Sequence, residues 1–102
     1  MKKILQLLEN IDFQIYQATC RIHHNGETTV QNIGEILRGM PGVLTVVQVE
    51  HDPDKNSAIM KIKIITKKSS KEGFKSFVNT TLERVKLIRK IEVAENTIEQ
   101  KN

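Results

Sequence analysis

The spacing of apolar residues changes twice along the middle of the chain, between Thr28 and Val93. It goes from about four residues to two and back again, which indicates helix, strand, strand, helix and strand in turn. Met40-Pro41-Gly42-Val43 is the pivot, because it ends a helix and begins a strand within one short segment. A further strand precedes Thr28, since the residues from Phe13 to Ile22 alternate. The pattern therefore predicts six elements in the order β-α-β-β-α-β.

This order predicts an α+β fold of the ferredoxin-like class, in which a four-stranded antiparallel sheet carries two helices on one face. We expect residues 12–94 to form this domain, and the polar residues 95–102 to form a C-terminal tail. The segment from Lys2 to Ile11 lies outside the pattern. It is expected to be an amphipathic N-terminal helix over residues 1–11, because one broad side carries Ile4, Leu5, Leu7, Leu8 and Ile11.

Local signals define the ends of the expected elements. Thr28 with Gln31 forms a capping box at the start of the first domain helix, and Gly39 ends that helix. Ser69 with Glu72 begins the second helix in the same way. The segments His23 to Gly26 and Asp52 to Asn56 are expected to be a loop and a turn. The expected inward rows of two strands are Tyr16, Ala18, Cys20 and Ile22, and Ala58, Met60, Ile62 and Ile64.

Length and composition limit the class of protein. The 102 residues suffice for one domain that buries somewhat over 60% of its unfolded surface, so disulfides or metals are not needed for folding. The single Cys20 has no partner for an internal disulfide. No stretch approaches the roughly 18 apolar residues of a membrane-spanning helix. We expect a cytoplasmic protein, or a virion protein if the chain is viral.

Positive charge is concentrated in residues 61–90, which carry ten basic and two acidic side chains. Such a region attracts phosphate or an acidic protein surface, or it is a solvated face that keeps the protein soluble. An RNA-recognition domain stacks bases on aromatic residues of its third strand, and Ala58 to Ile64 contains none. Nonspecific binding of nucleic acid stays open as an alternative. The candidate basic patch is Lys61, Lys63, Lys67, Lys68, Lys71 and Lys75.

Candidate metal and catalytic groups are present, but their spacing does not favour such chemistry. Cys20, His23, His24 and His51 are residue types that bind zinc or copper, yet neighbouring histidines on an extended chain point to opposite sides. Asp52, Asp54 and Asn56 resemble the start of a calcium-binding loop, but Lys63 stands where the closing glutamate is needed. We therefore expect neither an enzyme nor a protein with a metal or cofactor.

The segment from Val30 to Ile64, with its helix, Pro41-Gly42-Val43 and valine-rich strand, resembles the heavy-metal-associated domains of copper chaperones and transporters. Those domains carry two cysteines in the loop after the first strand, where this chain has His23 to Glu27, so the metal role does not carry over. The same segment is similar to ACT domains, which bind amino acids at paired sheet edges. It also resembles small bacteriophage proteins of unassigned role.

The remaining signal is a surplus of apolar surface. Leu44, Val46, Ile59 and Ile65 are expected on the outer face of the sheet, beside Lys61 and Lys63. Either the N-terminal helix covers this face, or the face is an interface. We expect a non-catalytic assembly module that self-associates or docks on a larger complex, such as a small phage structural or accessory protein. The expected interface residues are Ile4, Leu8, Leu44, Val46 and Ile59.

A small-ligand sensor is the alternative that the ACT-like resemblance implies. Its ligand would lie at a dimer edge, between the segment His23 to Thr28 of one chain and Met40 to Val43 of its neighbour. A protein partner or a second copy of the chain is the partner we expect from the residues themselves. No membrane partner is expected.

Overall fold

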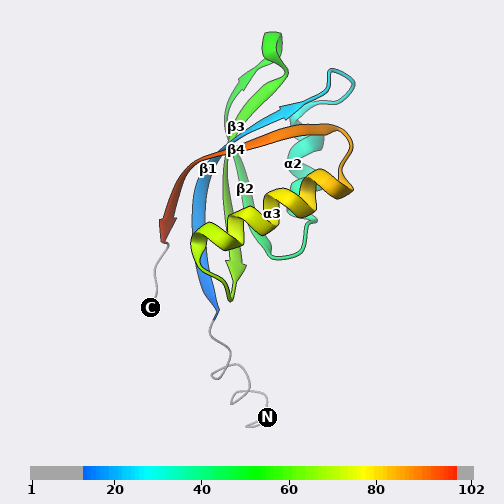
Figure 1. Ribbon diagram of the computed structural model, residues 1–102. Helices are drawn as coiled ribbons and strands as arrows, with labels where there is room; N and C mark the ends of the chain where they lie inside the picture. The colour runs from blue at the N-terminus through cyan, green and yellow to red at the C-terminus, as the bar shows by residue number, and fades with distance from the viewer. Residues whose placement is uncertain (1–12, 99–102) are drawn as a thin grey trace.

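The computed structural model describes residues 13–98 and shows an α+β fold with a four-stranded antiparallel sheet and two helices (Figure 1). The strands lie in the order β2-β3-β1-β4, so β2 and β4 are the edges. This confirms the α+β class, the antiparallel sheet and the two helices, an architecture compatible with a ferredoxin-like fold. In chain order the elements are β1 Gln14–His24, α2 Val30–Arg38, β2 Val43–Asp52, a 3₁₀ turn Pro53–Lys55, β3 Ser57–Thr66, α3 Ser70–Arg84 and β4 Ile88–Ile98.

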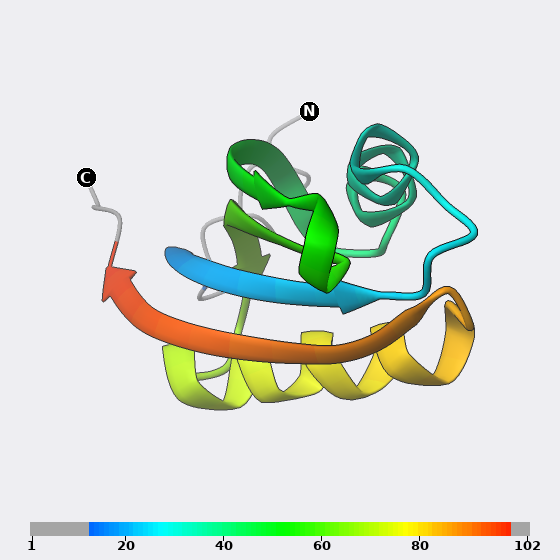
Figure 2. The same cartoon turned by 90° about the horizontal axis from the view of Figure 1, so that it is seen from above.

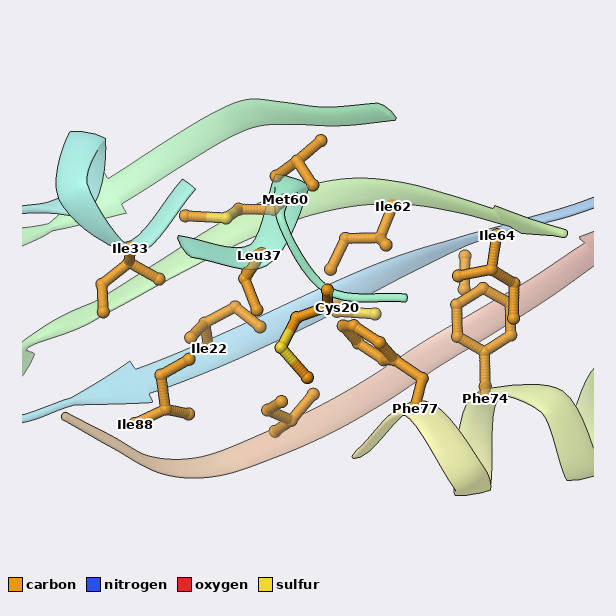
Figure 3. Close-up of a cluster of buried hydrophobic side chains, with 14 of the residues drawn as sticks. Cys20, Ile22, Ile33, Leu37, Met60, Ile62, Ile64, Phe74, Phe77 and Ile88 are labelled. Atoms are coloured by element: carbon orange, nitrogen blue, oxygen red, sulfur yellow. The ribbon is translucent and has the colours of Figure 1, made fainter. Parts of the chain in front are cut away.

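The core lies on one face of the sheet and is built by the even-numbered rows of the two central strands. Cys20 of β1 is opposite Met60 of β3, and Ala18 is opposite Ile62. Ile33 and Leu37 of α2 and Phe74 and Phe77 of α3 belong to the same buried cluster (Figure 3). α2 packs mainly on β2, and α3 packs mainly on β4 (Figure 2). We call the opposite side of the sheet, where the odd-numbered residues of β1 and β3 lie, the open face.

Both helix starts follow from hydroxyl capping, although one cap differs from the prediction. Ser69 caps α3 as expected, since its hydroxyl accepts from the Glu72 amide at 3.2 Å. The cap of α2 is Thr29 and not Thr28, because the Thr29 hydroxyl accepts from the Asn32 amide at 3.1 Å. The Thr28 hydroxyl instead accepts from the Asn32 side chain. Gly39 ends α2, as predicted.

The side assignment of Val46 is wrong in the sequence-based prediction. The pairing of β2 with β3 shifts between Val43 and Thr45, where the extra residue Leu44 makes a β-bulge. An extra residue exchanges the two faces for the positions that follow it, here as far as the second shift between Gln48 and Glu50. Val46 therefore lies opposite Ile62 in the core and is only 4% exposed, while Val47 lies opposite Lys61 and is 56% exposed.

Two strand ends also differ from expectation. β1 continues through His23 and His24, which were expected in a loop. The reason is backbone pairing: His24 pairs with Ile88 of β4, and its amide donates to the Asn56 carbonyl at 2.9 Å. β4 extends to Ile98, so residues 95–98 belong to the sheet and not to a tail. Backbone pairing with β1 places the polar residues 95–97 in a strand, although they show no apolar alternation. The predicted helix over residues 1–11, including Ile4 and Leu8, lies outside the described residues.

Candidate functional site

The open face is a mixed surface of apolar and basic side chains. Its rows can be followed across the strands from the paired registers: Ile15 lies beside Ile65, Thr19 lies beside Lys61, and Lys61 lies beside Val47. Neither α2 nor α3 covers it, because both contribute to the core on the other side. The open face therefore carries apolar side chains at the end with Ile15 and Ile65 and at the end with Ile59, and Lys61 and Lys63 lie between them.

Apolar exposure is greatest along the edge strand β2. Leu44, Val47 and Val49 are each about half exposed, at 47%, 56% and 49%. Leu44 was predicted at the interface and is accessible, and Ile59 is half-buried. Val46 cannot serve in this way because it is in the core. Val47 and Val49 were missed, since two register shifts, at Leu44 and between Gln48 and Glu50, decide which valines face outward.

A second exposed apolar group surrounds the start of β1. Phe13 and Ile15 are 45% and 36% exposed, and Ile15 pairs with the half-buried Ile65. The alternation that places Tyr16 in the core also assigns Ile15 to the other face, so this group could have been found from the sequence. The two groups lie at the β1 start and along β2.

The candidate basic patch is divided between two sides of the molecule. Lys61 and Lys63 lie on the open face of β3. Lys71 and Lys75 are exposed on α3, which packs on the opposite face. Lys67 and Lys68 are exposed in the segment that connects β3 to α3. The fold therefore does not align these six lysines as one strip for a phosphate backbone.

The structure does not bring the four candidate metal ligands together as one group, although two of the histidines are neighbours. Cys20 is fully buried in the core, while the His23 ring reaches Glu92, with Nε2 and Oε1 3.0 Å apart. His24 is buried on the core side, where its Nδ1 donates to the Asn25 carbonyl at 2.8 Å. The rings of His24 and the exposed His51 have centroids 6.2 Å apart. Within residues 13–98, no group of three or more histidine, cysteine or acidic residues could hold a metal ion.

Burial makes Cys20 a poor nucleophile. Desolvation raises the pKa of the thiol to about 12, because the core disfavours the thiolate. We expect the folded protein to resist alkylation by iodoacetamide at pH 8, whereas the same protein in guanidinium reacts fully at its one cysteine. Mass spectrometry counts the added groups. Rapid modification of the folded protein would contradict the buried placement.

Glu92 on β4 forms a small charged cluster with two neighbours on the sheet surface. The hydrogen bond from His23, and then the contacts with Lys90 at 3.2 Å, lower the pKa of the Glu92 carboxyl. Because the folded pKa is depressed, any stabilisation is present above the ordinary glutamate value and is lost as pH falls through the folded value. We expect His23→Ala to raise the midpoint of Glu92 in an NMR titration, and His51→Ala to leave it unchanged. Equal effects of the two variants would contradict this cluster.

A broad hollow of about 530 Å³ lies where the β2–β3 hairpin meets the end of β1, at the upper end of Figure 1. Its lining carries both signs of charge, with Arg21 and Lys55 beside Glu50 and Asp52. The Arg21 guanidinium reaches the Ser57 hydroxyl at 3.4 Å. The two segments that the ACT-like resemblance implied as a ligand site lie at opposite ends of α2 in one chain.

Among the residues described, the structure offers exposed apolar side chains on β2 and a hollow whose lining carries both signs of charge. No helix within residues 13–98 has the length and apolar character needed to cross a membrane. Comparisons with protein-family models, with curated proteins and with solved structures find no match.

Proposed function

We propose that this chain is a non-catalytic assembly module of ferredoxin-like topology that self-associates or docks on a larger protein complex. The surface that carries the proposal is the docking strip, defined as Leu44, Val47 and Val49 of β2. Single exposed apolar residues are ordinary on a monomer. Three half-exposed ones within six residues of one edge strand are a concentration that favours an interface.

Burial of the docking strip against a partner contributes favourable free energy to association. Complete burial of a valine or leucine side chain contributes about 1.5–3 kcal/mol, and these three side chains are already about half covered. Contact with a partner therefore gains a few kcal/mol from the strip alone. The half-buried Ile59 extends the same surface. Lys61, beside Val47 on the open face, orients the surface toward an acidic partner.

Docking through side chains is favoured over addition of a strand to the free edge. The Arg38 guanidinium of α2 donates to the Val46 carbonyl at 3.1 Å, so one acceptor of β2 is already occupied. The two register shifts in β2 also interrupt the regular edge that a new strand needs. Bulges and covered edges are ways in which proteins prevent edge-to-edge pairing.

The test is the mass of the native full-length protein, measured by light scattering over a wide range of concentration. Self-association predicts a mass that rises above one chain as concentration increases. The proposal is contradicted if the protein stays monomeric and also, when immobilised, retains no partner from a cell extract.

The mixed-charge hollow favours one second candidate, a site for a small zwitterion such as an amino acid. Arg21 and Lys55 could receive its carboxylate, and Glu50 and Asp52 its ammonium group. A ligand that binds only the folded protein raises the melting temperature. Thermal melts with a panel of amino acids therefore separate the candidates: a shift supports the sensor, whereas no shift with a mass above one chain supports assembly. Divalent metals in the same panel are expected to produce no shift.

A further inference from the structure

We propose that the open face binds a second copy of this chain, face to face, so that Lys61 of each copy pairs with Glu50 of the other. The inference rests on the self-association proposed above, and it adds the orientation of the two copies. The occupant of the open face, including the docking strip along its β2 edge, is thus the same surface of a second chain.

The first argument is the distribution of charge along the strands. The paired registers define two neighbouring rows of the open face: one holds Val47 and Lys61, and the next holds Glu50 and Ile59. Lys61 and Glu50 are both exposed, and neither belongs to an ion pair within residues 13–98. The open face therefore carries an accessible cation and an accessible anion one row apart.

The second argument is symmetry. A two-fold axis parallel to the strands lays each row on the same row of the second copy, so the two Lys61 rows meet. An axis perpendicular to the strands, between the two rows, lays the row of Lys61 on the row of Glu50. Glu50 is then one strand, about 4.8 Å, from the position opposite Lys61, which a lysine side chain spans. A two-fold contact repeats each pair, and like charges are costly, so charge favours the second orientation.

The neighbouring polar groups agree with this orientation. The same axis lays the row of Thr45 and Lys63 on the row of Asp52 and Ser57, so a second lysine approaches a second carboxylate. Arg21 lies in the row of Glu50, but its guanidinium reaches the Ser57 hydroxyl at 3.4 Å, which is one row further from the contact with Lys61. Across β1, β2 and β3, the pairs that form therefore join opposite charges.

The third argument is area. Strands of about ten residues extend about 33 Å, and four of them span about 19 Å. The open face thus offers about 600 Å² on each copy, or about 1,200 Å² in total, which reaches the lower end of specific protein interfaces. The docking strip lies within this area, so its apolar side chains are covered by the same contact.

Reversal of single charges in the full-length protein tests the pair. Lys61→Glu and Glu50→Lys each bring like charges together twice in the dimer, so we expect each to raise its dissociation constant about tenfold or more. Sedimentation equilibrium measures the constant, and circular dichroism checks folding. Lys75→Glu and Glu83→Lys, at exposed positions of α3, are the matched controls and should leave the constant unchanged. Unchanged association of both reversed variants would overturn this inference and leave self-association standing.

An equal mixture of Lys61→Glu and Glu50→Lys chains is the decisive measurement. In a mixed dimer, positions 61 and 50 carry opposite charges at both contacts again. We expect the mixture to recover the mass of two chains at a concentration where each variant alone has the mass of one. Failure to recover it, while the unchanged protein dimerises, would overturn the orientation only. A one-chain mass for the unchanged protein at every concentration would overturn self-association and this inference together.

Discussion

Phe74→Ala is expected to lower the free energy of unfolding by about 3–5 kcal/mol, because it empties the centre of the core. Phe74 is 1% exposed, and its ring packs edge-to-face on Phe77 with centroids 6.3 Å apart. A small domain has about 5–15 kcal/mol of stability in total, so the variant loses a large part of it. Urea unfolding of the full-length protein, followed by circular dichroism, measures the change.

Phe13→Ala is the matched control, since it removes the same side chain from a position that is 45% exposed. We expect this variant to change the free energy of unfolding by about 1 kcal/mol or less, as surface substitutions do. Equal losses for the two phenylalanines would contradict the assignment of the core to the helix-covered face.

Val46→Lys and Val47→Lys are expected to have opposite consequences although the two residues are neighbours. Val46 lies in the core, and burial of an unpaired ammonium group there costs several kcal/mol. Val47 is exposed, so a lysine at that position should change stability by about 0.5 kcal/mol or less. We therefore expect Val46→Lys to be largely unfolded and, at a dilution where the unchanged protein is a single chain, Val47→Lys to melt like the unchanged protein.

This pair of variants also tests the β-bulge at Leu44. Strict alternation along β2 without the bulge would place Val46 on the open face and Val47 in the core. Val46→Lys would then be folded and Val47→Lys largely unfolded. Thermal melts of both variants, measured side by side, decide between the two registers. A folded Val46→Lys protein would contradict the register shift between Val43 and Thr45.

The sequence predicts most of the elements because each has a local physical cause. Gly39 ends α2, and the Ser69 hydroxyl starts α3. The even-numbered row from Tyr16 to Ile22 is buried because hydrophobic alternation in a strand defines one inward face. These signals come from neighbouring residues and need no knowledge of the remaining chain.

The differences arise where pairing between strands overrides the local pattern. The bulge at Leu44 depends on how β2 aligns with β3, and valines at 43, 46, 47 and 49 look alike in either register. The continuation of β1 through His24 and of β4 through Ile98 likewise depends on partners distant in sequence. Because residues 95–97 are polar, the sequence pattern did not predict that β4 extends through them.

The candidate surfaces were predictable to the same extent. Apolar residues on the open face follow from alternation, and Leu44 and Ile59 were identified on that basis. Val47 and Val49 required the register. The separation of Lys61 from Lys75 follows from the predicted fold, because Lys61 was expected on the outer face of the sheet and both helices on the other face. The lining of the charged hollow comes from three strands, so no short stretch of the sequence could predict it.

The mass of the native protein, compared with that of Val47→Lys, tests the docking strip most directly. One chain has a mass of 11.7 kDa. We expect light scattering at high protein concentration to give a larger mass for the unchanged protein, and the one-chain mass for Val47→Lys with an unchanged circular dichroism spectrum. A one-chain mass for the unchanged protein at every concentration, or the same larger mass for both proteins, would contradict self-association through β2.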